Sequence, residues 1–447
     1  MKKLFFIAMF SIAYISSAQT LSYNDIGVLF SQENTNGTAR FNAMSGAFGA
    51  LGGDISAMDI NPAAAAVFLK SEFAISVNNR NTQLNSSFYG NNASTENDYF
   101  NLSQAGGVFV FKNYSRNNDW GNIAIGFNYS IMNDFENFWT SGGNSGYAPI
   151  TDLYDYDPVV YVNYDGQHFE NFTNGKTDKY SFTLASKFNN NLYLGASLNT
   201  YNVNYYQNIL IEEYNNDGSG NTFDVSQAQQ LSTYGDAFSF NVGLISKPNE
   251  NVRLGLAYQS PIWYTLSEDF IEYDVSIYEN DINTTNDYSG DNAFDYKLKT
   301  PSKLTGSFAY IFEKQGLISV DYTYKDYSNI TLTNANFSDE NQAFNTDLES
   351  VGELKIGTEW RFENLSVRGG YHKAKSPYKN ALNSEDIEGF SLGAGFKFKG
   401  GNFDLSYQKS SYTTPYNFYP QPENSQIEPV NLNIDNSKFT ATLVLNI

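Results

Sequence analysis

Apolar and polar residues alternate one by one over long stretches of the chain from about residue 73 onward. Clear examples are 123–131, 252–259 and 390–399, and in the last of these every second residue from Phe390 to Phe398 is apolar. A period of two residues is that of a β-strand, because successive side chains point to opposite faces of a sheet. The pattern therefore predicts strands with one apolar and one polar face.

The predicted strands and their links follow a regular order. Counting the alternating segments gives about fourteen strands. Short links fall at 189–190, 247–250, 313–315, 363 and 399–401, with a medium one at 113–120. Long polar links fall between them at 84–101, 136–177, 208–233, 267–294, 331–350, 377–386 and 412–436. In an antiparallel meander this order places the short turns on one side and the long loops on the other. That is the layout of an all-β transmembrane barrel with short periplasmic turns and long extracellular loops.

The first residues have the pattern of a secretory signal peptide. Lys2 and Lys3 precede an apolar run from Leu4 to Tyr14, and small residues ending at Ala18 provide a cleavage site. The run is shorter than the roughly 20 residues that a membrane-spanning helix needs. We therefore expect a signal peptide at 1–18, a separate segment at 19–70 and the barrel at 71–447. The expected location is the cell outer membrane of a Gram-negative-type bacterium.

Composition and charge narrow the range of partners. The chain has no Cys, which excludes disulfides and thiolate metal sites, and 34 Tyr and 35 Phe supply most of its aromatic residues. A formal net charge of −21 disfavours nucleic acid as a partner. The mean hydropathy of −0.43 is compatible with a membrane barrel, because lumen-facing polar residues alternate with lipid-facing apolar ones.

Residues 19–70 lack the strand period and are rich in small side chains. Gly46, Gly49, Gly52 and Gly53 lie within eight residues, which allows close backbone approach and positive φ. Asn61 precedes Pro62 and four alanines, a pattern that favours a capped helical turn. Either a periplasmic extension or a compact plug inside the lumen would fit these features. The plug explains why the side chains are small.

Ala39-Arg40, Gly46-Ala47, Gly49, Asp54 and the Asn61-Pro62-Ala63 motif follow one another in the segment 19–70. Their order resembles the N-terminal hatch of the FadL/TodX family of outer-membrane transport proteins. Downstream matches are Gly255-Leu256-Ala257-Tyr258-Gln259-Ser260-Pro261, Thr300-Pro301-Ser302-Lys303-Leu304, and Arg368-Gly369-Gly370-Tyr371 with Pro377. The resemblance implies a barrel of fourteen strands with a hatch in its lumen.

The resemblance also implies a function. It suggests passive uptake of hydrophobic compounds such as long-chain fatty acids, with hatch movement and lateral release through the wall. No cofactor, metal or enzymatic activity is expected. The expected partners are hydrophobic small molecules, outer-membrane lipids, lipopolysaccharide and the barrel-assembly machinery, and the expected state is monomeric.

Alternation and strand direction suggest roles for the inward-facing charged residues. Lys303 lies near mid-height and is the candidate for a ligand carboxylate, with Phe41, Met44 and Phe48 of the hatch as candidate apolar lining. The remaining inward charges lie near the short turns, at the level of a hatch, and we interpret them as hatch anchors: Arg253, Arg361, Arg368, Asp321, Glu359 and Asp404.

Three other functions remain open at this point. A general porin would lack a plug, and a surface adhesin would use the long acidic loops. An outer-membrane lipid hydrolase would need a nucleophile beside a histidine, but neither His168 nor His372 has an adjacent Ser or Cys in a recognisable motif. Asp152, Asp155 and Asp157 have no defined calcium-loop spacing, so we interpret them as solvated or lipopolysaccharide-facing acids.

Overall fold

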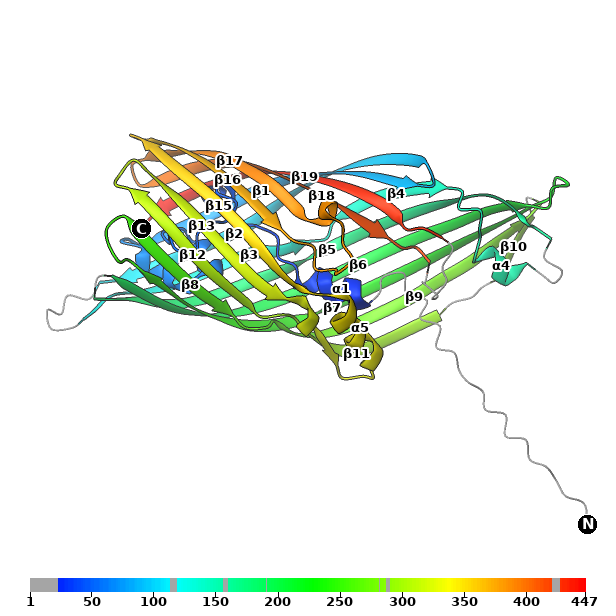
Figure 1. The fold of residues 1–447 in the computed structure, drawn as a ribbon, viewed down its shortest axis with the longest axis horizontal. Helices are drawn as coiled ribbons and strands as arrows, with labels where there is room; N and C mark the ends of the chain where they lie inside the picture. Colours follow the sequence, from blue (N-terminus) through cyan, green and yellow to red (C-terminus); the bar gives the residue numbers. More distant parts are fainter. Residues whose placement is uncertain are drawn as a thin grey trace, which may run out of the picture.

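The computed structural model describes residues 23–112, 119–155, 160–189, 191–280, 282–286, 290–419 and 427–447. The predicted signal peptide at 1–18 and Asp157 lie outside these residues. The chain forms one tall antiparallel sheet that closes on itself, because β1 pairs with both β2 and β19 (Figure 1).

Nineteen strand segments make up the wall, and several join end to end. The segments that form a wall strand alone are β1 (Glu72–Phe88), β2 (Asn91–Phe111), β5 (Asn163–Phe188), β6 (Leu192–Asn216), β7 (Thr222–Ser246), β15 (Ser350–Phe362), β16 (Leu365–Ala374), β17 (Ile387–Phe398), β18 (Gly401–Tyr416) and β19 (Val430–Asn446). The joined segments are β3 (Trp120–Asp134) with β4 (Asn137–Gly143), β8 (Val252–Gln259) with β9 (Trp263–Glu279), β10 (Ile282–Asn286) with β11 (Gly290–Lys299) and β12 (Lys303–Phe312), and β13 (Gly316–Asp326) with β14 (Thr331–Thr333). Within the described residues this gives fourteen wall strands, which confirms the predicted count.

Several of the predicted long loops are wrong in secondary structure. The segment 208–233 is mostly strand, because β6 continues to Asn216 and β7 begins at Thr222. The segment 267–294 likewise holds most of β9, all of β10 and the start of β11. These strand ends have apolar residues on the inside, such as Ile209 and Ile211, and polar residues on the outside. Because the extensions leave the membrane, their outer faces are polar, and the sequence there looks like loop.

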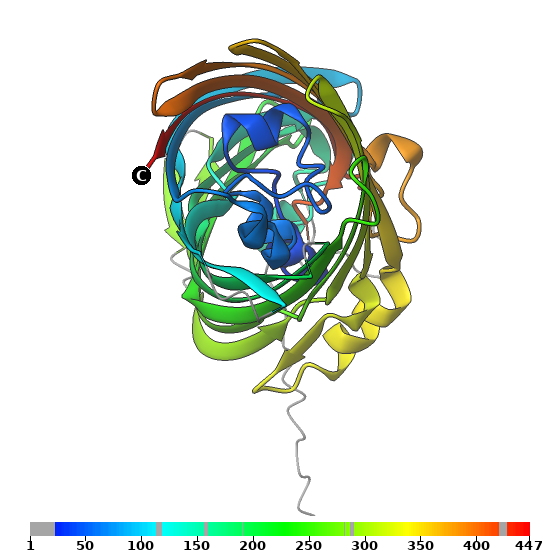
Figure 2. The same cartoon turned by 90° about the vertical axis from the view of Figure 1, so that its left-hand side faces the viewer.

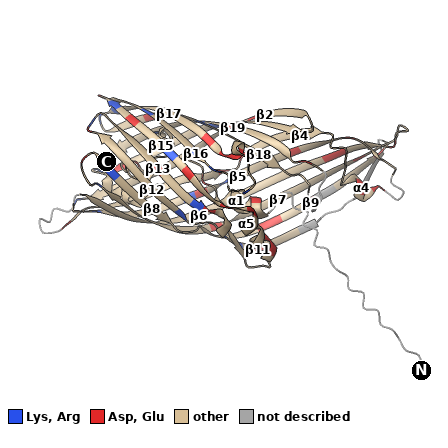
Figure 3. Ribbon diagram, in the orientation of Figure 1, with Lys and Arg blue, Asp and Glu red and all other residues tan. Residues whose placement is uncertain are grey.

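We call the half of the barrel with the short turns its lower half. The outer face of this half carries the apolar side chains that a lipid-facing wall requires. Phe182, Leu198 and Phe238 are all more than half exposed on this face. Further from the short turns, the outer face of β6 carries the polar side chains of Asn202 and Asn204 instead. None of the helices in the described part of the chain is long and apolar enough to cross a membrane. In Figure 3 the blue basic segments gather in the half with the C-terminus, and the opposite strand ends carry red acidic ones.

The N-terminal segment lies inside the barrel (Figure 2). It comprises α1 (Tyr23–Ser31), α2 (Ala39–Ala43), α3 (Ala57–Ile60) and the 3-10 helix η1 (Pro62–Val67). The other helical segments belong to the connections: α4 (Thr151–Tyr154), η2 (Tyr327–Asn329), α5 (Ser338–Asp347) and η3 (Asn383–Glu385). We call residues 23–70 the hatch, and α5 lies outside the ring of strands (Figure 2).

Three groups of buried apolar side chains fill the lumen at different heights. The hatch–wall cluster joins Phe48 and Met58 to the lower wall. The chamber cluster joins α1, through Ile26 and Phe30, to a set of wall tyrosines. The mouth cluster joins the extended ends of the strands, around Phe169 and Phe418. The hatch thus takes part in two of the three groups.

Candidate functional site: the hatch, the chamber and the wall opening

The Asn-Pro-Ala signature fastens the hatch to the wall. The Asn61 side chain caps η1 by accepting a hydrogen bond from the Ala63 amide at 3.1 Å. Its amide nitrogen donates to the carbonyl oxygens of Gly49 at 2.8 Å and Leu244 at 3.0 Å. At Gly243 of β7 a Cβ would overlap the Asn61 side chain. One buried side chain therefore organises the helical turn and connects it both to the hatch and to β7.

The small-residue turn of the hatch packs against the nearby strands β12 and β13 of the wall. The Gly49 amide donates to the Asp321 carboxylate at 2.8 Å, and a Cβ at Gly49 would overlap Ser307. Gly46 adopts a φ of 77°, which only glycine tolerates easily. Asp54 accepts hydrogen bonds from the Thr38 hydroxyl at 2.9 Å and the Ser56 amide at 3.0 Å. Burial raises the pKa of this carboxyl.

An ionic network lies under the hatch at the end of the barrel with the short turns. The Glu359 carboxylate accepts from Arg40 of the hatch at 2.7 Å, from Arg368 at 2.8 Å and from Arg361 at 2.8 Å. Arg368 also donates to Asp404 at 2.6 Å. The network lines a cavity of about 570 Å³ between hatch and wall. This polar floor is a poor path for an apolar ligand.

The predicted anchors differ in how they reach the hatch. Glu359, Asp321 and Arg253 bond to it directly, the last through the Leu51 carbonyl oxygen. Among the described residues, Arg361 and Arg368 reach it through Glu359, and Asp404 reaches it through Arg368. Their role as hatch anchors stays a prediction that these contacts favour.

Above the floor, α1 occupies an apolar chamber. The Phe30 ring lies 6.1 Å from both Tyr205 and Tyr264, and the Tyr264 hydroxyl donates to the Phe30 carbonyl oxygen at 3.2 Å. Phe344 of α5 packs against Gly27 from the other side, so closely that a Cβ there would lie 2.7 Å from the ring. The helix fills a space lined by aromatic rings.

Beside the chamber the wall is open between β2 and β3. β2 pairs with β1 from Asn91 to Val108, but its ladder with β3 ends at Gln104 opposite Ser130. Beyond this point β3 continues to pair with β5, with a register shift between Ile131 and Asn133. Among the described residues, side chains rather than backbone ladders cross the opening, such as Asn101 to Asp134 at 2.9 Å.

The hatch takes the place of the missing strand partner at this opening. The Asn34 amide donates to the Met132 carbonyl oxygen at 3.1 Å, and the Asn36 side chain donates to the Ile131 carbonyl oxygen at 2.9 Å. Phe135, at the end of β3, packs 5.9 Å from Phe30 in the chamber. The end of β3 therefore contacts the hatch through Ile131 and Met132, and Phe135, which follows it, contacts the chamber.

The chain can now be compared with known proteins. Residues 19–411 match the family model of the outer membrane protein transport protein (OMPP1/FadL/TodX). The chain belongs to this family. It is a family of outer-membrane transport proteins and not of enzymes, so the expected resemblance and outer-membrane location are confirmed.

Individual relatives of this OMPP1/FadL/TodX member support the fold. Outer membrane protein P1 of Haemophilus influenzae is 28% identical over 178 residues, which span 38% of this chain and 37% of that protein. A Pseudomonas aeruginosa FadL homologue has a TM-score of 0.58 at 14% identity, covering 93% of this chain and 99% of its own. The Pseudomonas putida toluene transporter TodX has a TM-score of 0.55 at 12% identity, covering 93% and 100%.

Lys303, the predicted carboxylate ligand, already contacts a carboxylate in this family member. Its ammonium group donates to Glu33 of the hatch at 2.7 Å. Burial opposes ionisation of Glu33, but the ammonium groups of Lys303, Lys325 and Lys179 outweigh it and hold the pKa of this carboxyl well below its usual range. Glu33 is therefore an anion at neutral pH.

The three predicted lining residues lie outside the chamber cluster, and their role as ligand lining stays a prediction. Phe41, Met44 and Phe48 are buried in the hatch–wall cluster, and the Phe41 and Phe48 rings lie 5.4 Å apart. They pack the hatch against the lower wall and do not belong to the chamber cluster. The chamber is lined instead by α1 and the wall tyrosines, which the sequence did not single out.

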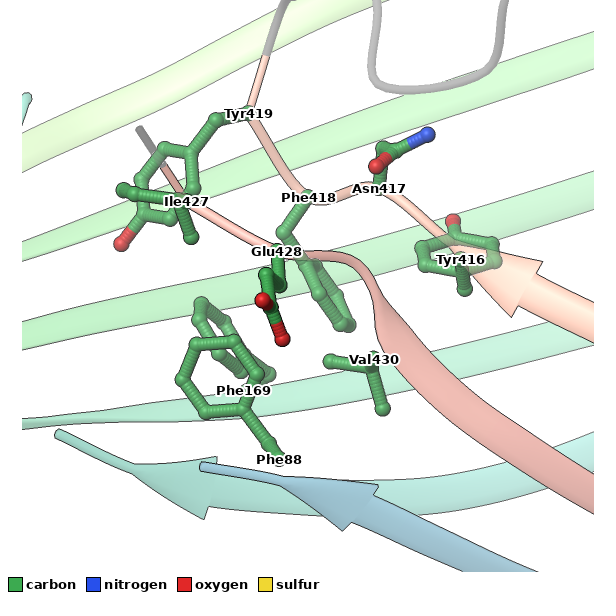
Figure 4. A pocket seen from close by; sticks show the side chains of 9 residues that line it. All are labelled: Phe88, Phe169, Tyr416, Asn417, Phe418, Tyr419, Ile427, Glu428 and Val430. Atoms are coloured by element: carbon green, nitrogen blue, oxygen red, sulfur yellow. The ribbon is translucent and has the colours of Figure 1, made fainter. Parts of the chain in front are cut away.

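Packed aromatic rings lie at the extracellular end of the described lumen. Figure 4 shows Phe88, Phe169, Phe418 and Val430 around a small pocket. Phe169 and Phe418 stack with centroids 4.2 Å apart, and the pocket holds only about 10 Å³, enough for about one water. A ligand that passes this way must separate these rings.

His168 and the loop acid Asp155 have local partners, whereas the Nδ1 atom of His372 has none among the described residues. His168 lies 3.5 Å from Glu170 on β5, and His372 is buried on β16. Asp155 accepts from the backbone amides of Val160 and Tyr161, both at 2.9 Å. In the described part of the chain no group of three or more His, Cys, Asp or Glu could hold a metal ion.

Proposed function

We propose that this chain is a passive channel that takes up hydrophobic compounds with long apolar tails, such as fatty acids. The ligand is held in the chamber that α1 now fills. It leaves sideways through the opening between β2 and β3 after the upper hatch moves. The observation that carries this proposal is the juxtaposition of an apolar chamber with an opening in the wall at Phe135.

Magnitudes indicate what such a chamber selects. Burying a sixteen-carbon tail is worth roughly 12 kcal/mol gross, at about 0.8 kcal/mol per CH₂. A charged hydrogen bond to a carboxylate adds about 1.5–3 kcal/mol. The tail therefore provides most of the affinity, and Lys303 orients the ligand. Lateral release is favoured over release through the floor, because the floor is an ionic network that an apolar tail would have to desolvate.

The test is a reversible cross-link over the opening. Cysteines at Asn101 and Asp134, whose side chains touch at 2.9 Å, are joined by a short bis-methanethiosulfonate linker. No native thiol interferes, because the chain has no Cys. We expect uptake of labelled palmitate by cells to stop in the linked protein and to return after reduction.

A matched pair controls for the linker itself. Asn81 and Asp98 also touch through their side chains, at 3.1 Å, but their strands β1 and β2 are already paired. A link there should leave uptake intact. Unchanged uptake with the opening linked would refute lateral release.

The ligand class is tested separately. We expect lipids that co-purify with the detergent-extracted protein, identified by mass spectrometry, to include carboxylated amphiphiles, and these to decline in Lys303→Ala. The same lipids in both proteins would remove Lys303 from the site.

A further inference from the structure

Three adjacent strands place hydrogen-bond donors at one level inside the barrel. Lys303 of β12 lies directly opposite Gln259 of β8 and directly opposite Lys325 of β13. Two like charges in facing positions of a sheet destabilise each other. The row formed by Gln259, Lys303 and Lys325 therefore favours a bound anion. It can donate hydrogen bonds to that anion from two ammonium groups and one amide.

Glu33 is the anion that the row holds in this structure. Its carboxylate accepts from Lys303 at 2.7 Å and from Gln259 at 3.3 Å, and it lies 3.6 Å from Lys325. Lys325 also donates to the Ser31 carbonyl oxygen at 2.7 Å. Glu33 is the only acidic residue between Asp25 and Asp54, so the carboxylate is supplied by one residue.

The residues before Glu33 resemble the apolar tail of an amphiphilic ligand. α1 ends at Ser31, two residues earlier, and its buried Ile26, Val28 and Phe30 lie in the chamber cluster. The segment 23–33 therefore combines an apolar body in an aromatic chamber with one carboxylate on a row of cations. That is the chemistry of an anionic amphiphile.

We propose that Glu33 is an internal competitor for the carboxylate of the ligand: it lowers the affinity of the chamber for carboxylated amphiphiles relative to neutral ones, and it leaves the cations only when a ligand carboxylate replaces it. This inference rests on the proposed function. An incoming carboxylate replaces Glu33 on Lys303, Lys325 and Gln259, while its tail replaces α1 in the chamber.

The exchange reaches the wall opening directly. The residue after Glu33 is Asn34, whose amide holds the Met132 carbonyl oxygen of β3, and Asn36 holds that of Ile131. Between them, the Thr35 carbonyl oxygen accepts from Lys438 of β19. When Glu33 leaves the cations, residues 34–36 lose the ionic attachment that precedes them and keep only the one to Lys438, which weakens their hold on β3.

Calorimetric titrations of the full protein in detergent with palmitate and with hexadecanol test the competition. The two probes share a tail and differ in charge. In Glu33→Gln we expect the ratio of palmitate to hexadecanol affinity to rise about tenfold or more, because the lysines lose their internal anion. The control is Asp54→Asn, a buried hatch carboxylate whose hydrogen-bond donors are Thr38 and Ser56, and it should leave the ratio unchanged.

An unchanged ratio in Glu33→Gln overturns the inference, whether both affinities rise together or neither moves. If wild type binds hexadecanol and palmitate with no distinction and Glu33→Gln does not alter this, the inference fails while the proposed function stands. If wild type binds neither probe, the proposed function itself fails.

The link to the opening has its own measurement. Thr35→Cys places a single thiol in the connecting segment and keeps its backbone contacts. We expect palmitate to accelerate alkylation of this thiol and hexadecanol to do so less, and Glu33→Gln to make it fast without ligand. A rate that neither palmitate nor Glu33→Gln changes would refute the coupling.

Discussion

The two ends of the hatch are held in opposite ways. The lower end, from Arg40 to Val67, is fixed by the Glu359 network, by the capped Asn61 turn and by wall glycines that leave no free space. The upper end, from Tyr23 to Asn36, is held by apolar packing, by Glu33 on Lys303, and by separate hydrogen bonds such as Tyr378 to Asp25 and Asn24 to Asp347. This difference indicates a fixed seal below and a movable segment above.

The largest effect should come from removing the two ends separately. Deleting residues 23–70 removes the seal, and we expect a nearly non-conducting barrel to become an open channel in planar bilayers. Deleting only 23–36 leaves the ionic floor in place, so conductance should stay low. If the intact protein already conducts ions strongly, it is a porin. If the short deletion conducts like the long one, the lower end is not the seal.

Breaking the lower end at its centre is the next largest effect. Glu359→Ala leaves Arg40 and Arg368 without their shared carboxylate, and both side chains are less than a fifth exposed. Removing one partner of a buried ion pair costs about 3–5 kcal/mol. We expect protease to cleave the hatch within the folded barrel at a lower urea concentration than in the wild-type protein.

Arg361→Ala is the matched control for that variant. Its side chain touches the same Glu359 but is 44% exposed, so solvent screens the pair. A loss of about 1 kcal/mol or less is expected. Equal losses in the two variants would show that the floor is not a buried network.

The sequence predicted the barrel well because a membrane wall repeats one rule along every strand. It predicted the hatch and its signature through the order of motifs around Asn61. It also directed attention to Lys303. It could not identify Glu33 as the partner of Lys303, because a contact over 270 residues of sequence has no local signal. The strand pairing adds the missing information: Lys303 faces Lys325, and two facing cations favour an anion between them.

The sequence also suggested Phe41, Met44 and Phe48 as ligand lining; they lie in the hatch–wall cluster, and their role as lining stays a prediction. Their apolar character is the same in both settings. Whether these side chains line a ligand site or pack the hatch against the wall depends on how far α2 lies from the chamber. That distance follows from where Arg40 and Gly49 attach to the wall.

A smaller effect separates the signature motif from the ionic floor. Asn61→Ala removes the donors to Gly49 and Leu244 and the cap of η1, leaving buried carbonyl oxygens unpaired. The cost should be about 1–3 kcal/mol in hatch docking, read by the same protease assay. Asn42, another buried hatch amide, contacts Thr440 and Gly37 and serves as a control site away from η1. Loss of the hatch in Asn61→Ala beyond that in Glu359→Ala would reverse the order of importance at the lower end.

The smallest effect concerns the upper end and is a single hydroxyl. Tyr264→Phe removes the hydrogen bond to the Phe30 carbonyl oxygen and keeps the ring that packs on α1. Its loss should cost about 1 kcal/mol, which corresponds to roughly fivefold faster alkylation of a thiol at Thr35. Tyr201→Phe is the control, because the Tyr201 hydroxyl bonds Ser239 of the wall at 2.8 Å and not the hatch. If both substitutions accelerate alkylation equally, the chamber loosens as a whole. Acceleration by Tyr264→Phe alone would show that single wall contacts of about 1 kcal/mol hold α1 in the chamber, and a ligand can compete with contacts of that strength.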